Sequence, residues 1–338
     1  MKKYILLLTT LVILNLMLIN VVTMKQKDPS YKNNTKEGNG KVRMKLMQNN
    51  VKSKRGLKSI IQPSNDFVGS KLSFEITPQN ILHQIMQNCT DTRYKVPNVV
   101  HYIWFGCKRE FNFYHYLSIM SVLHNMRPCA VVVHADCEPN NYWWNELISK
   151  RFDNFYLVHQ EAPNKIFNHT ISRVEHKSDV VRLEILIRWG GIYFDDTVLA
   201  IKSFNQLRNY SVVFPFQEKG ILNNGVIISE KNSTFLQTLY HESYTHYKKS
   251  AWAYNSCRYP WMLWKKHPQL DLHVEMKSFQ PPWNKWREVF YGNYEWKDKY
   301  AIHLYTKQIK RKINYPEAIF TMNSTFGEIS RLTLYQNT

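Results

Sequence analysis

Two neighbouring acids, Asp195 and Asp196, stand directly after a short apolar run at residues 192–194. Such a run predicts a buried strand, and open α/β sheets bind ligands beyond the carboxyl ends of their strands. Upstream, Asp179 and Arg182 are three residues apart, so they share one face if their segment is helical. Carboxylates beside a guanidinium at a strand end indicate a site for a divalent cation and an anionic ligand.

The segment that must position these residues reads as a helix, a turn and a strand. Apolar residues recur at helical spacing through residues 180–189. Ser178 and Asp179 are expected at the start of this helix, where side-chain oxygens accept hydrogen bonds from free backbone amides. Gly190 and Gly191 are expected to end it, because glycine adopts the left-handed conformation found after a helix.

The rest of the chain alternates apolar strands with helical segments. This alternation predicts right-handed βαβ units and therefore an α/β fold with a mostly parallel central sheet. We expect strands at residues 99–106, 130–134, 155–158, 192–194, 211–216, 225–229 and 301–305, and helices at residues 111–125, 142–150, 178–189, 235–247 and 261–266. Residues 280–299, rich in tryptophan, proline and charge, are expected to be irregular.

The amino-terminal region differs in composition. Residues 4–22 form an uncharged apolar run that, as a helix, nearly spans a hydrocarbon layer of about 30 Å. A cleaved signal peptide is the alternative, but residues 19–23 lack the small residues of a cleavage site. We therefore expect a cytosolic tail at residues 1–3, a transmembrane anchor at 4–22, a disordered basic stem at 23–65 and a luminal domain at 66–338.

The formal net charge of +19 does not indicate a nucleic-acid-binding protein. Residues 25–58 hold eleven lysines and arginines against two acids, so much of the excess lies in the predicted stem. Such a polar segment with few aromatic residues is typical of a solvated linker. The smaller excess of positive charge in the rest of the chain suits an anionic substrate such as a nucleotide diphosphate.

The five cysteines match no zinc-binding spacing. Cys107 and Cys137 each follow a predicted strand, so we expect a disulfide between them, with two buried thiols as the alternative. The chain also has six Asn-x-Ser/Thr sequons, at Asn33, Asn88, Asn168, Asn209, Asn232 and Asn323. This number exceeds what the composition predicts and favours a location in the secretory pathway.

Three blocks of sequence together resemble glycosyltransferase family 32, the DXD-containing sugar transferases that include α-1,4-galactosyltransferases and α-1,4-N-acetylglucosaminyltransferases. The blocks are Val96-Pro97-Asn98-Val99-Val100-His101-Tyr102-Ile103-Trp104-Phe105-Gly106, Ser178-Asp179-x-x-Arg182 and Gly190-Gly191-Ile192-Tyr193-x-Asp195. The resemblance covers residues 95–310 in order and extends to the glucosyltransferase domains of large clostridial toxins.

This resemblance implies a GT-A type nucleotide-sugar-binding fold, a UDP-sugar donor and Mn²⁺ as the cofactor. The reaction that it implies moves a hexose or N-acetylhexosamine to a glycan or glycolipid acceptor with retention of the anomeric configuration. It also implies a single-pass type II Golgi membrane protein with a luminal catalytic domain, in agreement with the predicted anchor and stem.

The resemblance also implies roles for single residues. Asp195 would bind the metal and the donor ribose, Asp179 would accept hydrogen bonds from sugar or ribose hydroxyls, and Arg182 would orient the donor. Trp104 would stack on the uracil ring, with a core tryptophan as the alternative. Asn224 would lie near the anomeric carbon and take part in catalysis, with an Asn-Gly turn as the alternative.

The resemblance is weaker at three other positions, Asn223, Asn255 and Ser256. Asn223 precedes Asn224 in the same Leu-Asn-Asn-Gly block. Asn255 and Ser256 fall where the family has a loop on the donor or acceptor side.

The chain departs from the family at the acidic motif, where Asp-x-Asp is replaced by Asp195-Asp196-Thr197. Side chains alternate along a strand, so Thr197 shares a face with Asp195 and Asp196 points away. Thr197 then stands at a metal-ligand position, where a hydroxyl is a weaker ligand than a carboxylate. Three outcomes are open: Asp196 turns inward because the strand has ended, other ligands compensate, or the metal and the activity are lost.

His303 is the candidate compensating metal ligand, with a core histidine as the alternative. If the metal is lost, the chain would be a membrane-anchored pseudoenzyme or a glycan-binding relative. The replacement at Thr197 is the feature that favours this second function.

Overall fold

The computed structural model describes residues 78–335 except residues 90, 280–282, 311 and 314. The predicted tail, transmembrane anchor and stem lie outside the described residues. Among the residues that are described, no helix combines the length and the apolar character needed to cross a membrane.

A mixed β-sheet runs through the centre of the described domain. Its strands, in spatial order, are β11 (His273–Glu275), β8 (Val212–Glu218), β10 (Val226–Ser229), β6 (Gly191–Phe194), β1 (Val99–Trp104), β2 (Ala130–Ala135) and β3 (Phe155–His159), with β9 (Ile221–Leu222) paired to β8. The pairs β1–β2, β2–β3, β1–β6 and β8–β11 are parallel, whereas β10 runs antiparallel to β6 and β8. The predicted α/β fold with a mostly parallel sheet is confirmed.

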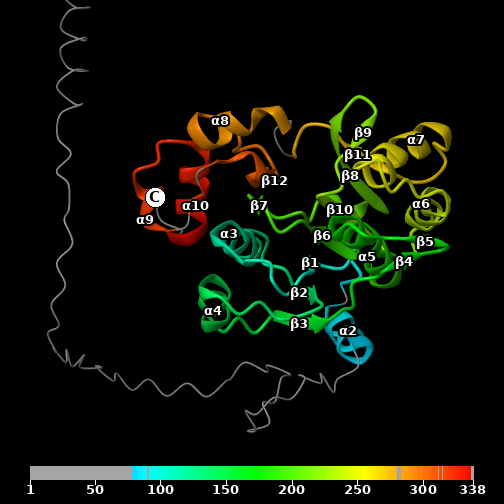
Figure 1. Ribbon diagram of the computed structural model, residues 1–338, viewed down its shortest axis with the longest axis horizontal. Coiled ribbons are helices and arrows are strands. Elements are labelled where there is room, and N and C mark those ends of the chain that lie inside the picture. The colour runs from blue at the N-terminus through cyan, green and yellow to red at the C-terminus, as the bar shows by residue number, and fades with distance from the viewer. Residues whose placement is uncertain (1–77, 90, 280–282, 311, 314, 336–338) are drawn as a thin grey trace, which may run out of the picture. The chain divides into compact units, whose positions relative to one another are not determined.

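Helices cover both faces of this sheet (Figure 1). They are α2 (Pro78–Asn88), α3 (Phe113–Ser121), α4 (Tyr142–Ser149), α5 (Val174–Trp189), α6 (Thr234–Thr245), α7 (Tyr259–Lys266), α8 (Trp286–Tyr291), α9 (Glu317–Phe320) and α10 (Thr325–Tyr335). Alternate residues of β1 enter two cores, Tyr102 on the side of α3 and α10 and Ile103 on the side of α5 and α6. A strand that is buried on both faces explains the continuous apolar run in the sequence.

Two small sheets complete the domain. β4 (Lys165–Ile166) pairs with β5 (His169–Thr170), and β7 (Val198–Ala200) pairs antiparallel with β12 (Ala301–His303). The second pair matters for the site, because it places His303 opposite Val198, close to the acidic motif that ends just before β7. The stretch predicted to be irregular contains the short helix α8, so that prediction was wrong in part.

Helix α5 starts earlier than its sequence suggested. It begins at Val174 after the extended residue Arg173, and the hydroxyl of Ser178 donates to the Val174 carbonyl one turn back. The prediction that Ser178 and Asp179 cap the helix was therefore wrong. Asp179 instead lies in the second turn, on the face that Arg182 shares.

The glycine pair at the end of α5 behaves as predicted. Gly190 and Gly191 have φ angles of +70° and +110°, which other residues rarely adopt. A Cβ atom at Gly191 would also lie only 2.8 Å from His101 Nε2 and from the Val99 carbonyl oxygen. Close approach of β6 to β1 therefore requires glycine at this turn.

Two buried histidines, His101 and His134, form a hydrogen-bonded chain that ends at the Gly190 carbonyl of this turn. His101 Nε2 lies 3.1 Å from the Gly190 carbonyl, to which it can only donate, so His101 Nδ1 is an acceptor. His134 Nε2, at 3.0 Å, must then donate to His101 Nδ1. Burial lowers the pKa of His101 to about 4 and takes the pKa of His134 well below its ordinary value, so both rings are neutral at pH 7.

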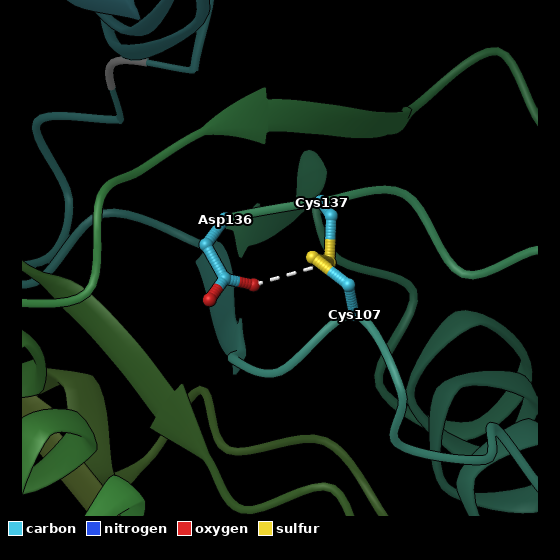
Figure 2. A group of neighbouring side chains, drawn as sticks. All are labelled: Cys107, Asp136 and Cys137. Atoms are coloured by element: carbon cyan, nitrogen blue, oxygen red, sulfur yellow. Dashed lines mark hydrogen bonds between the residues drawn. A yellow bond between two sulfur atoms is a disulfide. The ribbon is translucent and has the colours of Figure 1, made fainter.

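The predicted disulfide between Cys107 and Cys137 is confirmed, and it joins the segments that follow β1 and β2 (Figure 2). The Asp136 carboxylate lies beside it and accepts a hydrogen bond from the Gly106 amide at 3.0 Å. These two cysteines bond to each other, so they provide no thiolates for a metal with Asp136. A second disulfide, Cys89–Cys129, was not predicted, because pairing does not follow from cysteine spacing alone.

Candidate functional site

Asp179, Arg182 and Asp195 form one cluster at the carboxyl end of β6, in which Asp179 and Arg182 are buried and Asp195 is half-buried. Arg182 Nη2 lies 3.1 Å from Asp179 Oδ1, and Arg182 Nη1 lies 3.4 Å from Asp195 Oδ1. The guanidinium packs 4.2 Å from the centre of the Tyr193 ring. Arg182 is only 5% exposed, so its charge depends on these two carboxylates for compensation.

Asn224 belongs to the same cluster. Its Nδ2 donates to Asp179 Oδ1 at 2.7 Å, and its carbonyl accepts from Arg182 Nη1 at 2.6 Å. Arg182 Nε also donates to the Ser178 carbonyl, so most of the guanidinium donors are used within the protein. Burial raises the pKa of Asp179, while the adjacent Arg182 opposes this change.

Asp195 is held by its neighbours in a defined orientation. The Tyr193 hydroxyl donates to Asp195 Oδ1 at 2.6 Å, and the Asp195 amide donates to the Gly225 carbonyl at 2.7 Å. With Oδ1 engaged by Tyr193 and Arg182, the second carboxylate oxygen faces the position of Gly225. One oxygen of this predicted metal ligand is therefore anchored and the other is directed into the site.

Asp196 lies in a turn after the strand has ended, yet it does not join the cluster. Its carboxylate pairs with Arg109, and His115 Nε2 lies 3.9 Å away. Burial alone would raise the pKa of Asp196, but the charges of Arg109 and His115 bring it below its ordinary value. Of the three outcomes open for the motif, an inward-turned Asp196 is not the one found in this structure.

Thr197 follows in the same turn and is half-buried. Its carbonyl accepts a hydrogen bond from the Leu304 amide at 3.0 Å, which ties the motif to the residue after β12. A metal-binding role for its hydroxyl stays a prediction.

Trp104 is 2% exposed and packs against Phe111 and His115, with ring centroids 5.3 and 5.1 Å away. The Arg109 guanidinium lies 4.1 Å from its ring centre. This conformation leaves no free face on which a base could stack. The predicted stacking on uracil is therefore not supported, and the alternative of a core tryptophan is.

His303 lies near the acidic motif with an available nitrogen. Its Nδ1 is buried and has no hydrogen-bond partner among the described residues, and its ring stacks on Tyr305 with centroids 4.4 Å apart. Burial lowers the pKa of His303 against the opposing charges of Asp195 and Asp196, so the imidazole is neutral at pH 7.

The position of Gly225 shows how closely these groups converge. A Cβ atom there would lie 3.0 Å from His303 Nδ1 and 3.1 Å from Asp195 Oδ2. A neutral imidazole nitrogen and a carboxylate oxygen around one point are ligands that Mn²⁺ accepts. Asp195 and His303 therefore fit a divalent cation, and their role as metal ligands stays a prediction.

Asn255 and Ser256 differ in their contacts. Asn255 is buried and supports its own loop, since its Nδ2 donates to the Ser243 carbonyl at 2.6 Å and its Oδ1 accepts from the Lys248 amide at 2.9 Å. Ser256 instead lines the same small cavity as Asp179, and its hydroxyl acts to lower the pKa of that carboxyl.

Sequence reasoning missed Tyr244, whose helix was interpreted only as a core element. Its hydroxyl is buried without a hydrogen-bond partner among the described residues, and it lines a small cavity together with Asp179, Arg182, Asn224 and Ser256. An aromatic residue on an amphipathic helix gives no signal of such a position, because core tyrosines have the same pattern.

Comparison with known proteins gives a consistent result. Residues 115–214 match the family model described as a glycosyltransferase sugar-binding region containing a DXD motif. The chain is 29% identical over 262 residues to Glucan organizing enzyme 1 of Cryptococcus neoformans var. grubii, covering 70% of each protein. It is 24% identical over 149 residues to human lactosylceramide 4-alpha-galactosyltransferase, covering 39% of this chain and 41% of that protein.

Similar solved structures include the galactosyltransferase LgtC in complex with donor and acceptor sugar analogs, at a TM-score of 0.39 and 11% identity, covering 68% of this chain and 95% of that one. The PaToxG glycosyltransferase has a TM-score of 0.38 and 17% identity, covering 57% and 79%.

The family match and the cluster around Asp195 define the class of this protein as a glycosyltransferase with a DXD-type sugar-binding region. The predicted resemblance to glycosyltransferase family 32 is thereby confirmed.

Proposed function

We propose that this protein moves a hexose or N-acetylhexosamine from a UDP-sugar to a glycan or glycolipid acceptor, with retention of the anomeric configuration. The observation that carries the proposal is the cluster of Asp179, Arg182 and Asp195 with Asn224 at the end of β6. The matched lactosylceramide galactosyltransferases support a glycolipid acceptor by their name, although the chain spans less than half the length of most of them. A GT-A type fold is part of the same proposal.

A divalent cation, which we take to be Mn²⁺, would be held by Asp195 and His303. When bound, it supplies the positive charge that stabilises the departing diphosphate. The protein's own part is to keep one oxygen of Asp195 and one nitrogen of His303 beside each other next to Gly225. A ligand set that is fixed before the donor arrives needs little reorganisation during the reaction.

Arg182 acts mainly by positioning. It forms ion pairs with Asp179 and Asp195 and donates to two backbone carbonyls, so its planar fork sets the distance between the two acids. Asp179 would then accept a hydrogen bond from a donor hydroxyl through its remaining lone pairs. Because both acids are engaged with Arg182, we favour a direct front-face substitution over a covalent intermediate on either carboxylate.

We further propose a single-pass type II location in the Golgi membrane, with this domain in the lumen. Two disulfides support an oxidising compartment. The five sequon asparagines within the described residues, Asn88, Asn168, Asn209, Asn232 and Asn323, are all exposed, as glycosylation requires.

A donor screen tests the proposed reaction. The protein is incubated with a panel of UDP-sugars, Mn²⁺ and a set of oligosaccharide and glycolipid acceptors, and UDP release is measured. We expect release from one donor, dependent on Mn²⁺ and absent in Asp195→Ala. No release from any donor would contradict the proposal.

A pseudoenzyme that binds donor or glycan is the second candidate. Two observations favour it: Thr197 replaces a carboxylate, and the remaining acid of the motif, Asp196, is occupied by Arg109. Thermal stabilisation by UDP and Mn²⁺ in a protein that releases no UDP from any donor would establish it, since a ligand that binds only the native state raises its stability.

A further inference from the structure

Three polar atoms from separate parts of the chain surround Gly225. A Cβ atom at this residue would lie 2.9 Å from Asn223 Oδ1, in addition to the contacts with His303 and Asp195 described above. The φ angle of Gly225 is outside the positive range, so its backbone accommodates an L residue. Glycine is therefore needed here for space rather than for conformation, and the space is lined by ligand atoms.

The amide of Asn223 is fixed with its oxygen toward this space. Asn223 Nδ2 donates to Gln217 Oε1 at 2.9 Å, and Asn223 Oδ1 accepts from the Gly225 amide at 2.7 Å. A rotated amide would place two donors against each other at Gly225. A carbonyl oxygen has two lone pairs, so one stays available after the bond from Gly225.

We propose that Asn223 Oδ1 is a further ligand of the divalent cation held by Asp195 and His303, and that it compensates for the carboxylate missing at Thr197. The assignment rests on the proposed function, because that function supplies the cation. Amide oxygens are ordinary ligands for hard cations, and a neutral oxygen leaves more of the cation's charge for the diphosphate.

Mn²⁺ affinity tests this assignment independently of turnover. Free Mn²⁺ is measured by electron paramagnetic resonance while it is titrated into the full-length protein with UDP present. We compare the wild type, Asn223→Ala, Asn223→Asp and the control Asn209→Ala, whose asparagine is exposed. We expect Asn223→Ala to weaken binding at least about tenfold, Asn223→Asp to strengthen it, and Asn209→Ala to leave it unchanged.

The aspartate variant separates ligation from a structural role. A carboxylate cannot donate to Gln217, so a purely structural role predicts weaker Mn²⁺ binding in both Asn223 variants. Equal affinity in wild type and Asn223→Ala, or weaker binding in Asn223→Asp, would overturn the assignment of Asn223 alone. No Mn²⁺ binding by the wild type would overturn the proposed cation and this ligand together.

Discussion

The guanidinium of Arg109 pairs with the carboxylate of Asp196, which directs the second acid of the motif away from the site of Asp195 and His303. Arg109 belongs to the segment after β1 that the Cys107–Cys137 disulfide joins to the end of β2. The two adjacent acids therefore have different partners and should differ in function. Asp195 faces the proposed cation, and Asp196 connects the motif to the β1 loop.

Substitution of the two acids should show this difference. We expect Asp195→Ala to reduce kcat by at least about a hundredfold, since it removes a charge that acts at the reacting diphosphate. Asp196→Ala should lower kcat by less than about tenfold, because its partner Arg109 is partly exposed and can be hydrated. Steady-state kinetics of both variants make the comparison, and equal losses would contradict the separate functions.

Arg182 should be important for stability as well as for activity. Removal of one partner from a buried ion pair costs about 3–5 kcal/mol, so Arg182→Ala should lower the free energy of unfolding by that amount. Arg188→Ala on the same helix is the control, because Arg188 is exposed and its loss should cost less than about 0.5 kcal/mol. Urea denaturation measures both values. A decrease in the free energy of unfolding of less than about 1 kcal/mol for Arg182→Ala would show that the ion pairs of Arg182 contribute little to stability.

The Cys107–Cys137 disulfide should stabilise the segment that carries Arg109. We expect the double variant Cys107→Ala/Cys137→Ala to lose about 2–4 kcal/mol of stability. Cys257→Ser should show no comparable loss, because Cys257 is a free cysteine. Thermal unfolding of both variants provides the test, and equal melting temperatures for wild type and double variant would show that the disulfide does not stabilise the fold.

The paired histidines under the glycine turn should make the fold sensitive to acid. The pKa of His101 is about 4 in the folded protein, against about 6.5 in the unfolded chain. Between these values the unfolded state binds a proton that the folded state does not, so stability should fall as the pH decreases from 6.5 to 4. The loss from His101 alone should reach about 3 kcal/mol.

Urea denaturation at pH 7 and pH 4.5 measures this loss. The variant His134→Gln keeps a donor for His101 and removes one titrating ring, so its pH dependence should be smaller than that of the wild type. Identical pH dependence in the two proteins would show that His134 is not a neutral buried partner.

Gly225→Ala should block the site without unfolding the protein. The added methyl group would lie within about 3 Å of the three proposed ligand atoms, so Mn²⁺-dependent UDP binding should be lost. The melting temperature without ligand should fall by only a few degrees, because the methyl group overpacks the site while the backbone conformation suits alanine. Wild-type UDP affinity in this variant would show that the cation lies elsewhere.

Local signals in the sequence predicted the elements that carry the site, but not all of the contacts. The β1 run, the glycine pair after α5 and the placement of Asp195 follow from periodicity and from backbone conformation, which act over a few residues. The predicted start of α5 was wrong, because serine and aspartate are found inside helices as well as at their ends. Inside α5, the Asp179 carboxylate is paired with Arg182 and accepts a hydrogen bond from Asn224.

Contacts between segments that are distant in the sequence could not be predicted in this way. The burial of Trp104 depends on α3, which carries His115, and the orientation of Asp196 depends on Arg109. The approach of His303 to Asp195 depends on the pairing of β12 with β7, about a hundred residues apart. Side-chain alternation predicted that Asp196 points away from Asp195, as it does, but it could not predict the pairing with Arg109, because the strand ends at Phe194.

Calorimetric titration with UDP tests the central claim most directly. The wild type and Asp195→Asn are each titrated with UDP, once with Mn²⁺ and once with a chelator. We predict tight binding only for the wild type with Mn²⁺, because Asp195 is the proposed anionic ligand of the cation and the asparagine variant has the same size without the charge. UDP binding that is equal with and without Mn²⁺, or equal in Asp195→Asn, would contradict a metal-assisted nucleotide-sugar site at Asp195.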